Sequence, residues 1–435
     1  MKALVAILLP AALVAVVPSS AAASDCTVLH GGRVFDLEGT LSDEPTHLVI
    51  ADDPGTVVAR YVGEFPGAPG EDGTGTWDGR TCAWIDAAGK QIARGFVDPV
   101  SIMGLVEVGM EGGTRHQDPG GAEIVRASFD PAEAYDPSSI VIAAARREGI
   151  TSVVVHPSGG MVSGLATWVT LAGDTQAEAV APAPLAMRMG VVTGSRAGGL
   201  DALRDLLADV RDYEANRSSY DRNARREYVA SKRDLEALIP VVRDRMPVVI
   251  GADRAPDIEA LLRFAEEQRL RLVIDGGAEA HLLAEELAAA DVAVVVRPFV
   301  YGAGSFAQIR ARRDGTRILA EAGVTILFSA RSAHFGRKLR QMAGNAVREG
   351  LAHADAMSAL TSGVDLAYGT MGQADLKIGA GADLVVWSGD PLEISSRAEH
   401  VFIRGEEVSL DGRQEALLER YRTLPGTPVP ALTLP

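Results

Sequence analysis

The chain has 435 residues, of which 47% are hydrophobic and only 5% aromatic, so it is long enough to bury a large, mainly aliphatic core. Its formal net charge of −16 argues against nucleic acid and against an anionic membrane surface as partners. The length fits one α/β barrel of about 250 residues together with a smaller domain.

The chain begins with a pattern typical of a secretory signal peptide. Lys2 is followed by an apolar run over residues 3–17, and Ala21, Ala22 and Ala23 form a small-residue cleavage site. We expect residues 1–23 to be removed and the mature protein to be exported, either periplasmic or secreted; an uncleaved anchor is the alternative. No later stretch is long and uncharged enough to span a bilayer, which predicts no integral membrane segment in the mature chain.

The mature chain contains two cysteines, Cys26 and Cys82. Disulfides form and persist in the oxidising compartments that exported proteins reach. The pair therefore predicts one disulfide within the N-terminal part of the chain, and two unrelated buried thiols are the alternative.

Residues 24–90 have the pattern of a small all-β module. Short apolar runs separated by glycine-rich turns predict strands, whereas the Gly-, Pro- and acid-rich stretch over residues 66–79 predicts a loop. The expected strands are Cys26–Phe35 (two strands joined by a Gly-Gly turn), Thr46–Ile50, Val57–Val62 and Thr81–Ile85.

From residue 91 to residue 370, apolar strand-like runs alternate with amphipathic helices, as in a parallel α/β sheet. About eight strands can be counted, the number that a closed barrel needs, and a doubly wound open sheet is the alternative. Residues 200–245 are charged, helical and too long for one connection, so we expect a helical hairpin or an excursion there. The expected strands are Gln91–Val97, Thr151–His156, Leu165–Ala172, Leu185–Val192, Pro247–Gly251, Arg271–Asp275, Val292–Val296 and Val324–Phe328.

Two stretches carry a resemblance to a known family. Residues 89–104, GKQIARGFVDPVSIMG, place a Gly-Lys turn before a strand that Asp98-Pro99 is expected to end. Residues 376–391, LKIGAGADLVVWSGDP, form a glycine turn, a strand and a Gly-Asp-Pro stop. Both stretches resemble the amidohydrolase superfamily, nearest to its exported, imidazolonepropionase-like branch. The resemblance implies a (β/α)8 TIM-type barrel over residues 91–370, a small β-sandwich built from residues 24–90 and 371–424, and a loose tail over residues 425–435.

Amidohydrolase barrels hold one or two divalent metals with a His-x-His pair, a carboxylated Lys, two further His and an Asp. In this chain the corresponding positions carry side chains that do not bind cations or that repel them. The resemblance therefore implies that the metal centre has been lost and that no cofactor is expected. These positions are Val100 and Ile102 for the paired His, Thr170 for the Lys, Gly251 and Gly276 or Gly277 for the two His, and Ala330 or Arg331 for the Asp.

Other polar residues are predicted at strand ends, where barrel enzymes place their chemistry. Together they form a candidate polar site for a small charged solute. The interpretation that we favour over this site is an ion-pair cluster that fills the vacated cavity, because unpaired buried charge is costly. The candidate catalytic residues are Asp98, His156, Asp253 and Asp275, and the candidate substrate-binding residues are Arg297 and Arg331.

The activity implied by the resemblance is hydrolysis of C–N bonds other than peptide bonds, including cyclic amides. With its metal ligands lost, the chain is predicted to be an exported pseudoenzyme. It would bind a small charged or cyclic-amide ligand, or form an oligomer with itself or with an intact amidohydrolase sibling. The alternative is an active amidohydrolase with a rebuilt site, using a divalent metal such as zinc or a metal-free acid/base pair. A purely structural barrel is a third possibility.

Overall fold

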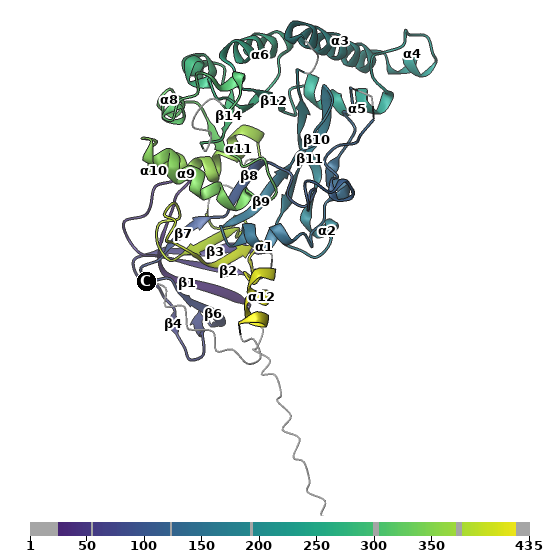
Figure 1. Cartoon of the computed structure of the whole chain (residues 1–435). Coiled ribbons are helices and arrows are strands. Elements are labelled where there is room, and N and C mark those ends of the chain that lie inside the picture. Colours follow the sequence, from purple (N-terminus) through teal and green to yellow (C-terminus); the bar gives the residue numbers. More distant parts are fainter. Residues whose placement is uncertain are drawn as a thin grey trace, which may run out of the picture.

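Two sheets organise the chain in a computed structural model that describes residues 25–53, 55–121, 124–191, 195–298, 304–370 and 376–422 (Figure 1). One sheet has ten strands and the other has eight. The predicted signal peptide, residues 1–23, and the predicted tail, residues 425–435, lie outside the described residues. Within the described ranges, none of the helices is both long and apolar enough to cross a membrane.

The ten-stranded sheet is built from both ends of the chain. The C-terminal strand β16 pairs antiparallel with β7, placing Val385 opposite Ala93, while β7 pairs in parallel with β1. This confirms that the chain returns from the barrel into the N-terminal sheet module. The strands of the module are β1 (Cys26–Val34), β2 (Thr46–Ala51), β3 (Thr56–Val62), β4 (Ala68–Pro69), β5 (Thr74–Trp77), β6 (Arg80–Asp86), β7 (Gln91–Arg94), β16 (Leu384–Trp387), β17 (Ala398–Ile403) and β18 (Glu406–Glu407).

The predicted loop over residues 66–79 was wrong in part, because it contains the short strands β4 and β5. Strand β5 pairs antiparallel with β6, with Gly75 opposite Cys82. A Cβ at Gly75 would lie 2.1 Å from an atom of the Trp84 ring, so only glycine lets this strand lie flat on the indole. The glycine that suggested a loop is instead what allows the pairing.

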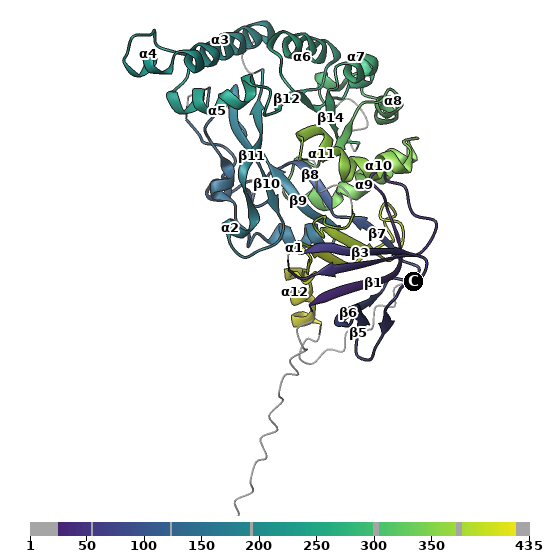
Figure 2. The ribbon, with the colours of Figure 1, turned by 180° about the vertical axis from the view of Figure 1, so that it is seen from behind.

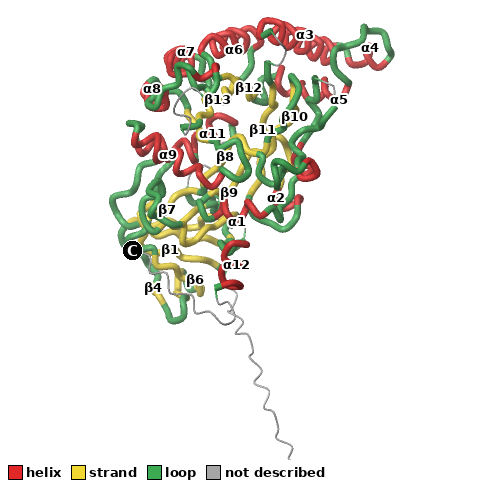
Figure 3. The backbone as a smooth tube through the Cα atoms, in the orientation of Figure 1, coloured by secondary structure: helices red, strands yellow, loops and turns green. Residues whose placement is uncertain are grey.

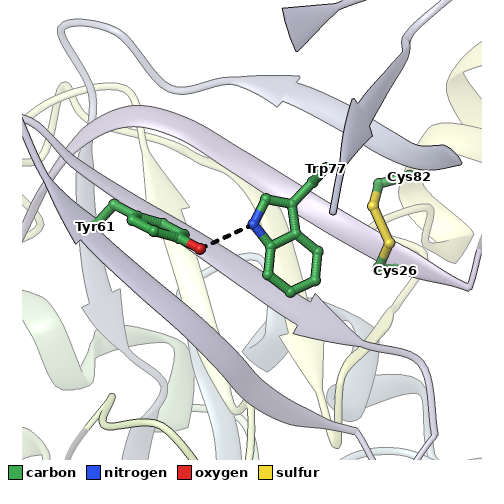
Figure 4. Close-up of a disulfide and its surroundings, with 4 residues drawn as sticks. All are labelled: Cys26, Tyr61, Trp77 and Cys82. Carbon is green, nitrogen blue, oxygen red and sulfur yellow. Dashed lines mark hydrogen bonds between the residues drawn. A yellow bond between two sulfur atoms is a disulfide. The ribbon is translucent and has the colours of Figure 1, made fainter. Parts of the chain in front are cut away.

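The predicted disulfide between Cys26 and Cys82 is confirmed. The two residues lie on the parallel neighbours β1 and β6, with their Cα atoms 4.7 Å apart, and both are buried. Figure 4 shows Trp77 and Tyr61 on the same part of the module, where the indole Nε1–H donates to the Tyr61 hydroxyl at 3.2 Å. The disulfide thus links β1, the first strand of the described chain, to β6, the last strand of the β4–β6 meander.

The eight-stranded sheet curls into a nearly closed barrel, in the order β8 to β15. Strand β10 runs antiparallel to both of its neighbours, so the barrel departs from a strict strand–helix repeat. From β11 onward each strand is parallel to the next, as predicted. The barrel strands are β8 (Phe96–Ser101), β9 (Ile150–Val155), β10 (Val162–Thr170), β11 (Val180–Met189), β12 (Val248–Ala252), β13 (Leu272–Gly276), β14 (Ala293–Val296) and β15 (Ile326–Phe328).

The predicted strand Gln91–Val97 is two strands, divided at Gly95. Its first half is β7 of the sheet module, and its second half, β8, opens the barrel. A Cβ at Gly95 would lie 2.1 Å from the Thr151 hydroxyl oxygen, so glycine is required where the chain changes sheets. The expectation that Asp98-Pro99 ends the strand was also wrong: β8 continues to Ser101 because Pro99 lies at an irregularity in its pairing with β9.

Strands β8 and β15 meet at the seam of the barrel through the side chain of Ser329. Its hydroxyl lies 2.6 Å from Asp98 Oδ1 and 2.8 Å from the carbonyl oxygen of Val100. Inside the barrel, aliphatic side chains of all eight strands form one cluster. Val364 and Tyr368 of helix α11 (Ser362–Tyr368) complete this cluster. The Tyr368 hydroxyl donates to the carbonyl of Pro99 at 2.8 Å. The interior is therefore packed, and any site must lie above it, at the carboxyl ends of the strands.

Helices α3, α6, α7 and α8 follow one another along the outer side of the barrel, as Figures 2 and 3 show. The predicted excursion over residues 200–245 is confirmed: α3 and α5 pack together, and α4 extends away from the barrel strands (Figure 1). The helices are α1 (Ile140–Arg146), α2 (Gln176–Ala179), α3 (Arg196–Ala215), α4 (Arg217–Asp221), α5 (Lys232–Val242), α6 (Ala255–Gln268), α7 (Ala284–Ala289), α8 (Gly315–Glu321), α9 (Leu339–Arg348), α10 (His353–Leu360), α11 (Ser362–Tyr368) and α12 (Arg413–Tyr421).

Candidate functional site

The barrel mouth, where the carboxyl ends of the parallel strands meet, holds the predicted site residues. Each lies within a barrel strand or no more than three residues beyond its carboxyl end, so the fold gathers residues that are distant in sequence. Asp98 belongs to β8 and His156 follows β9; Asp253 follows β12, Asp275 belongs to β13, Arg297 follows β14, and Arg331 comes three residues after β15.

The centre of the mouth is an ion-pair network around Asp275. Arg188 Nη1 lies 2.7 Å from Asp275 Oδ2, and Arg331 Nε lies 3.3 Å from the same oxygen. The Asp275 side chain is fully buried, whereas those of Arg188 and Arg331 are 12% and 34% exposed. Burial alone would raise the pKa of Asp275, but the guanidinium groups of Arg188, Arg331 and Arg297 outweigh it and hold the pKa below its ordinary value. Asp275 is therefore ionised at neutral pH.

Arg188 is the member of this ion-pair network that the sequence reasoning missed. It is the single charged residue near the end of β11, within the apolar segment PLAMRMG. A lone arginine in an apolar strand end is a signal of a buried ion pair, because an unpaired guanidinium would not be tolerated there. The sequence gives no indication of its partner, since Asp275 is separated from it by α3, α4, α5 and α6.

Asp98 is completely buried at the seam between β8 and β15. Its Oδ1 atom accepts from the Ser329 hydroxyl and from the Val100 N–H, whereas Oδ2 has no hydrogen-bond partner among the described residues. Burial raises the pKa of Asp98 to about 7, against the hydrogen bonds that favour its ionised form. The Asp98 carboxyl therefore gains and loses its proton near neutral pH, as a general acid or base must.

His156 lies beside this network and is neutral. Its Nε2 is 3.0 Å from the carbonyl oxygen of Pro99, which can only accept, so the proton is on Nε2. Burial, together with the nearby Arg188 guanidinium, lowers the pKa of His156 to about 3. Nδ1 is then a buried acceptor without a partner among the described residues.

Asp253 lies at the edge of the network, where its charge acts on Arg331. Its carboxylate accepts from the Ala278 N–H and from Gln308 Nε2, each at 3.3 Å. Asp253 and Arg297 line the same small pocket, which has a volume of about 50 Å³ and is also lined by Gly276. The structure thus groups Asp98, His156, Asp275, Arg297 and Arg331 with Arg188, a set that we call the mouth cluster. Asp253 belongs to the neighbouring pocket.

The residues at the mouth do not fit the metal centre that the resemblance implies. Val100 packs in the barrel interior, and a Cβ at Gly251 would lie 3.5 Å from Arg188 Nη2, so a guanidinium occupies the space that a side chain at 251 would enter. Among the described residues, no group of three or more His, Cys, Asp and Glu side chains is arranged to hold a metal ion. Zinc needs about three protein ligands, and a neighbouring cation opposes it.

The assignment of Thr170 to the position of the family's lysine was wrong. Because β10 runs antiparallel to β9, its last residue, Thr170, pairs with Ser152 near the beginning of β9. Thr170 therefore lies at the end of the barrel opposite the mouth. The residue was misplaced because an apolar strand pattern carries no information on strand direction.

Comparisons with known proteins find solved structures with a similar fold, but no family model or curated protein that matches the sequence. No family profile and no curated protein match this chain. Among solved structures, an amidohydrolase from Thermotoga maritima MSB8 is 23% identical with a TM-score of 0.75, covering 88% of this chain and 99% of that chain. A molinate hydrolase is 16% identical with a TM-score of 0.51, covering 89% and 95%, and a putative prolidase from Bifidobacterium longum is 14% identical with a TM-score of 0.51, covering 92% and 100%.

These likenesses define the class of fold: a mixed α/β chain with an amidohydrolase-type barrel and an attached sheet module. At these identities they establish the architecture alone. They agree with the resemblance read from residues 89–104 and 376–391, which lie where the chain enters and leaves the sheet module.

Replacing Asp98 by asparagine is expected to stabilise the protein more at pH 8 than at pH 5. The folded carboxyl, with a pKa of about 7, keeps its proton over a range in which the unfolded one, near 4, has lost it. Wild-type stability therefore falls as pH rises from about 4 to about 7, and Asp98→Asn, which does not ionise, should flatten this fall by on the order of 2 kcal/mol. Urea unfolding of both proteins at the two pH values measures the difference. An equal pH dependence in both would contradict the assignment.

Proposed function

We propose that this chain is an exported protein of the amidohydrolase type that has replaced its metal centre with a fixed organic cation and binds a small charged solute without hydrolysing it. The observation that carries the proposal is the Arg188–Asp275 ion pair, which lies next to Gly251, one of the positions where the family has a metal ligand. Export is supported by the Cys26–Cys82 disulfide, since such bonds persist in oxidising compartments.

The chemistry of the mouth supports binding over metal-assisted hydrolysis. Zinc activates water by lowering the pKa of a bound water molecule, and an arginine does not coordinate water in that way. What Arg188 offers is a permanent charge and planar N–H donors, which suit recognition of carboxylate or phosphate. The chain's own residues thus supply electrostatic binding and orientation at the place where the family performs chemistry.

Protein purified without chelators is expected to contain no stoichiometric metal, and EDTA is expected to leave its Tm unchanged. The reason is that the mouth offers a guanidinium and a salt-bridged carboxylate where ligands would be needed. Elemental analysis and a thermal melt before and after dialysis against EDTA measure both properties. One equivalent of zinc, manganese or iron that is lost in Asp253→Ala or Asp275→Asn protein would overturn the proposal.

A second candidate, a metal-free hydrolase of cyclic amides, is favoured by one observation. Asp98 combines a pKa of about 7 with an Oδ2 atom that has no partner among the described residues, as a general acid or base would. Hydrolysis of a cyclic amide by metal-free protein, abolished by Asp98→Asn, would favour this candidate over the binding protein.

Association with an intact amidohydrolase sibling, or with a second copy, remains a prediction that size-exclusion chromatography of mixed proteins can test.

A further inference from the structure

The loop that follows β8 forms a hairpin-like finger over residues 105–116. Its two sides are joined by an isolated antiparallel β-bridge between Val106 and Arg115. Nearer the tip, the Thr114 hydroxyl accepts from the Val108 N–H at 3.0 Å and lies 2.9 Å from the carbonyl oxygen of the same residue. The shape of the finger is thus fixed by hydrogen bonds within the finger itself.

The base of the finger is braced against two other parts of the chain. The Glu107 carboxylate accepts from the Ser139 hydroxyl at 2.5 Å and from the N–H of Ile140, the first residue of α1, at 3.2 Å. The carbonyl oxygen of Glu107 lies 3.0 Å from His334 Nε2, which joins the finger to the loop after β15. A segment that is already ordered in this way loses little conformational entropy when it binds a partner.

The tip of the finger is apolar and uncovered. Met110 is 100% exposed and Val108 is 50% exposed, and Phe335 in the loop after β15 is 53% exposed. Single exposed apolar side chains are ordinary, but these three belong to two loops that contact each other. Methionine is common at protein-binding surfaces because its flexible thioether adapts to a partner and packs well against aromatic rings. The two loops together therefore have the features of a docking surface.

The two loops also carry opposite charge. Among the described residues, Glu111 and Arg337 have no oppositely charged partner within their own chain. A further cation belongs to the aromatic side, because Lys338 Nζ lies 4.9 Å from the centre of the Phe335 ring. The charged residues are Glu107, Glu111, Arg115 and Asp118 in residues 102–121, and Arg331, Arg337 and Lys338 in residues 329–338. An acidic methionine-bearing side next to a basic phenylalanine-bearing side is complementary to a second copy of itself.

We propose that the chain forms a two-fold symmetric dimer through this finger patch, which consists of Val108, Met110, Glu111, Phe335 and Arg337. In such an interface the same surface meets itself in reverse, so that Met110 of one copy packs on Phe335 of the other and Glu111 lies opposite Arg337. A local match of charge is needed here, because two chains with a net charge of −16 repel each other. The inference goes beyond the proposed function and does not depend on it.

Sedimentation velocity of the disulfide-intact mature chain over a concentration series tests the inference. We expect a species of twice the monomer mass. Met110→Asp is expected to raise its dissociation constant at least roughly tenfold, because the new carboxylate would be buried against the Phe335 ring. Since Met110 is fully exposed, this change leaves the folding of the monomer undisturbed.

Ile394→Asp is the matched control. Ile394 is 71% exposed between β16 and β17, outside the finger patch, so its replacement should leave the dimer unchanged. Wild-type protein that stays monomeric at roughly 100 μM would overturn the inference and would leave the patch to a partner of another kind. A dimer that Met110→Asp and Ile394→Asp affect equally would also overturn it.

A double-mutant cycle tests the pairing of charges across the two-fold axis. Glu111→Gln removes the charge but keeps the acceptor for the Gly113 N–H at 3.2 Å, and Arg337→Gln removes the opposite charge. Each change is expected to weaken the dimer at least roughly threefold, and the double variant by less than the product, because both remove the same ion pairs. Independent effects would contradict this arrangement of the interface. Solute binding and metal content of the same preparations report separately on the proposed function.

Discussion

Replacing both Cys26 and Cys82 by alanine is expected to lower the free energy of unfolding of the sheet module by about 4 kcal/mol. The two cysteines are separated by 56 positions, and a cross-link over a loop of that length removes chain entropy of about this size from the unfolded state. Both residues are buried in the module's core, so the loss of sulfur packing acts in the same direction.

Urea unfolding followed by tryptophan fluorescence measures this loss, because Trp77 and Trp84 pack in the core cluster that contains both cysteines. Thr81→Ala is the matched control: Thr81 precedes Cys82 in β6 but is exposed, so its replacement should change stability by no more than about 0.5 kcal/mol. An alanine double variant with the wild-type unfolding midpoint, together with free thiols in the wild-type protein, would rule out the bond.

The parts of the fold that were predictable from the sequence are those fixed by local pattern. The buried runs that became β12, β13 and β14 are continuous, apolar and bounded by turns, and the structure has them within about two residues of the expected ends. The disulfide followed from the inferred compartment. The sheet module was predictable only in outline, because the turn residues in 66–79 conceal two short strands.

Features that depend on contacts between distant segments could not be predicted from the sequence. The reversed direction of β10 depends on the hairpin with β9 and not on its own residues. The division at Gly95 is set by the close approach of Thr151. In the site, Asp275, Arg297 and Arg331 were identified because each lies next to a strand end, whereas Arg188 was missed because its role depends on a partner from β13.

Replacing Asp275 by alanine is expected to destabilise the protein by about 3–5 kcal/mol. Removal of one partner from a buried ion pair leaves the other charge uncompensated, and here Arg188 and Arg331 would face each other without the carboxylate between them. Denaturant unfolding measures the loss. Glu259→Ala is the control, because its pair with Arg263 is exposed on both sides and should contribute less than about 1 kcal/mol. A loss no greater than that of the control would mean that the mouth is solvated and that the charges are not held by one another.

The double variant Asp275→Leu with Arg188→Met distinguishes what the charges of the network contribute to stability from what the packing of its side chains contributes. A buried ion pair replaced by apolar side chains of similar volume is often neutral or stabilising, so the double variant should recover most of the stability that Asp275→Ala loses. It should also lose the proposed binding of a small charged solute, because that binding depends on the Arg188 guanidinium beside Gly251. Recovered stability with lost binding is the combination expected if the pair is retained for recognition and not for folding. A double variant that is as unstable as Asp275→Ala would instead assign the network a structural role in closing the barrel.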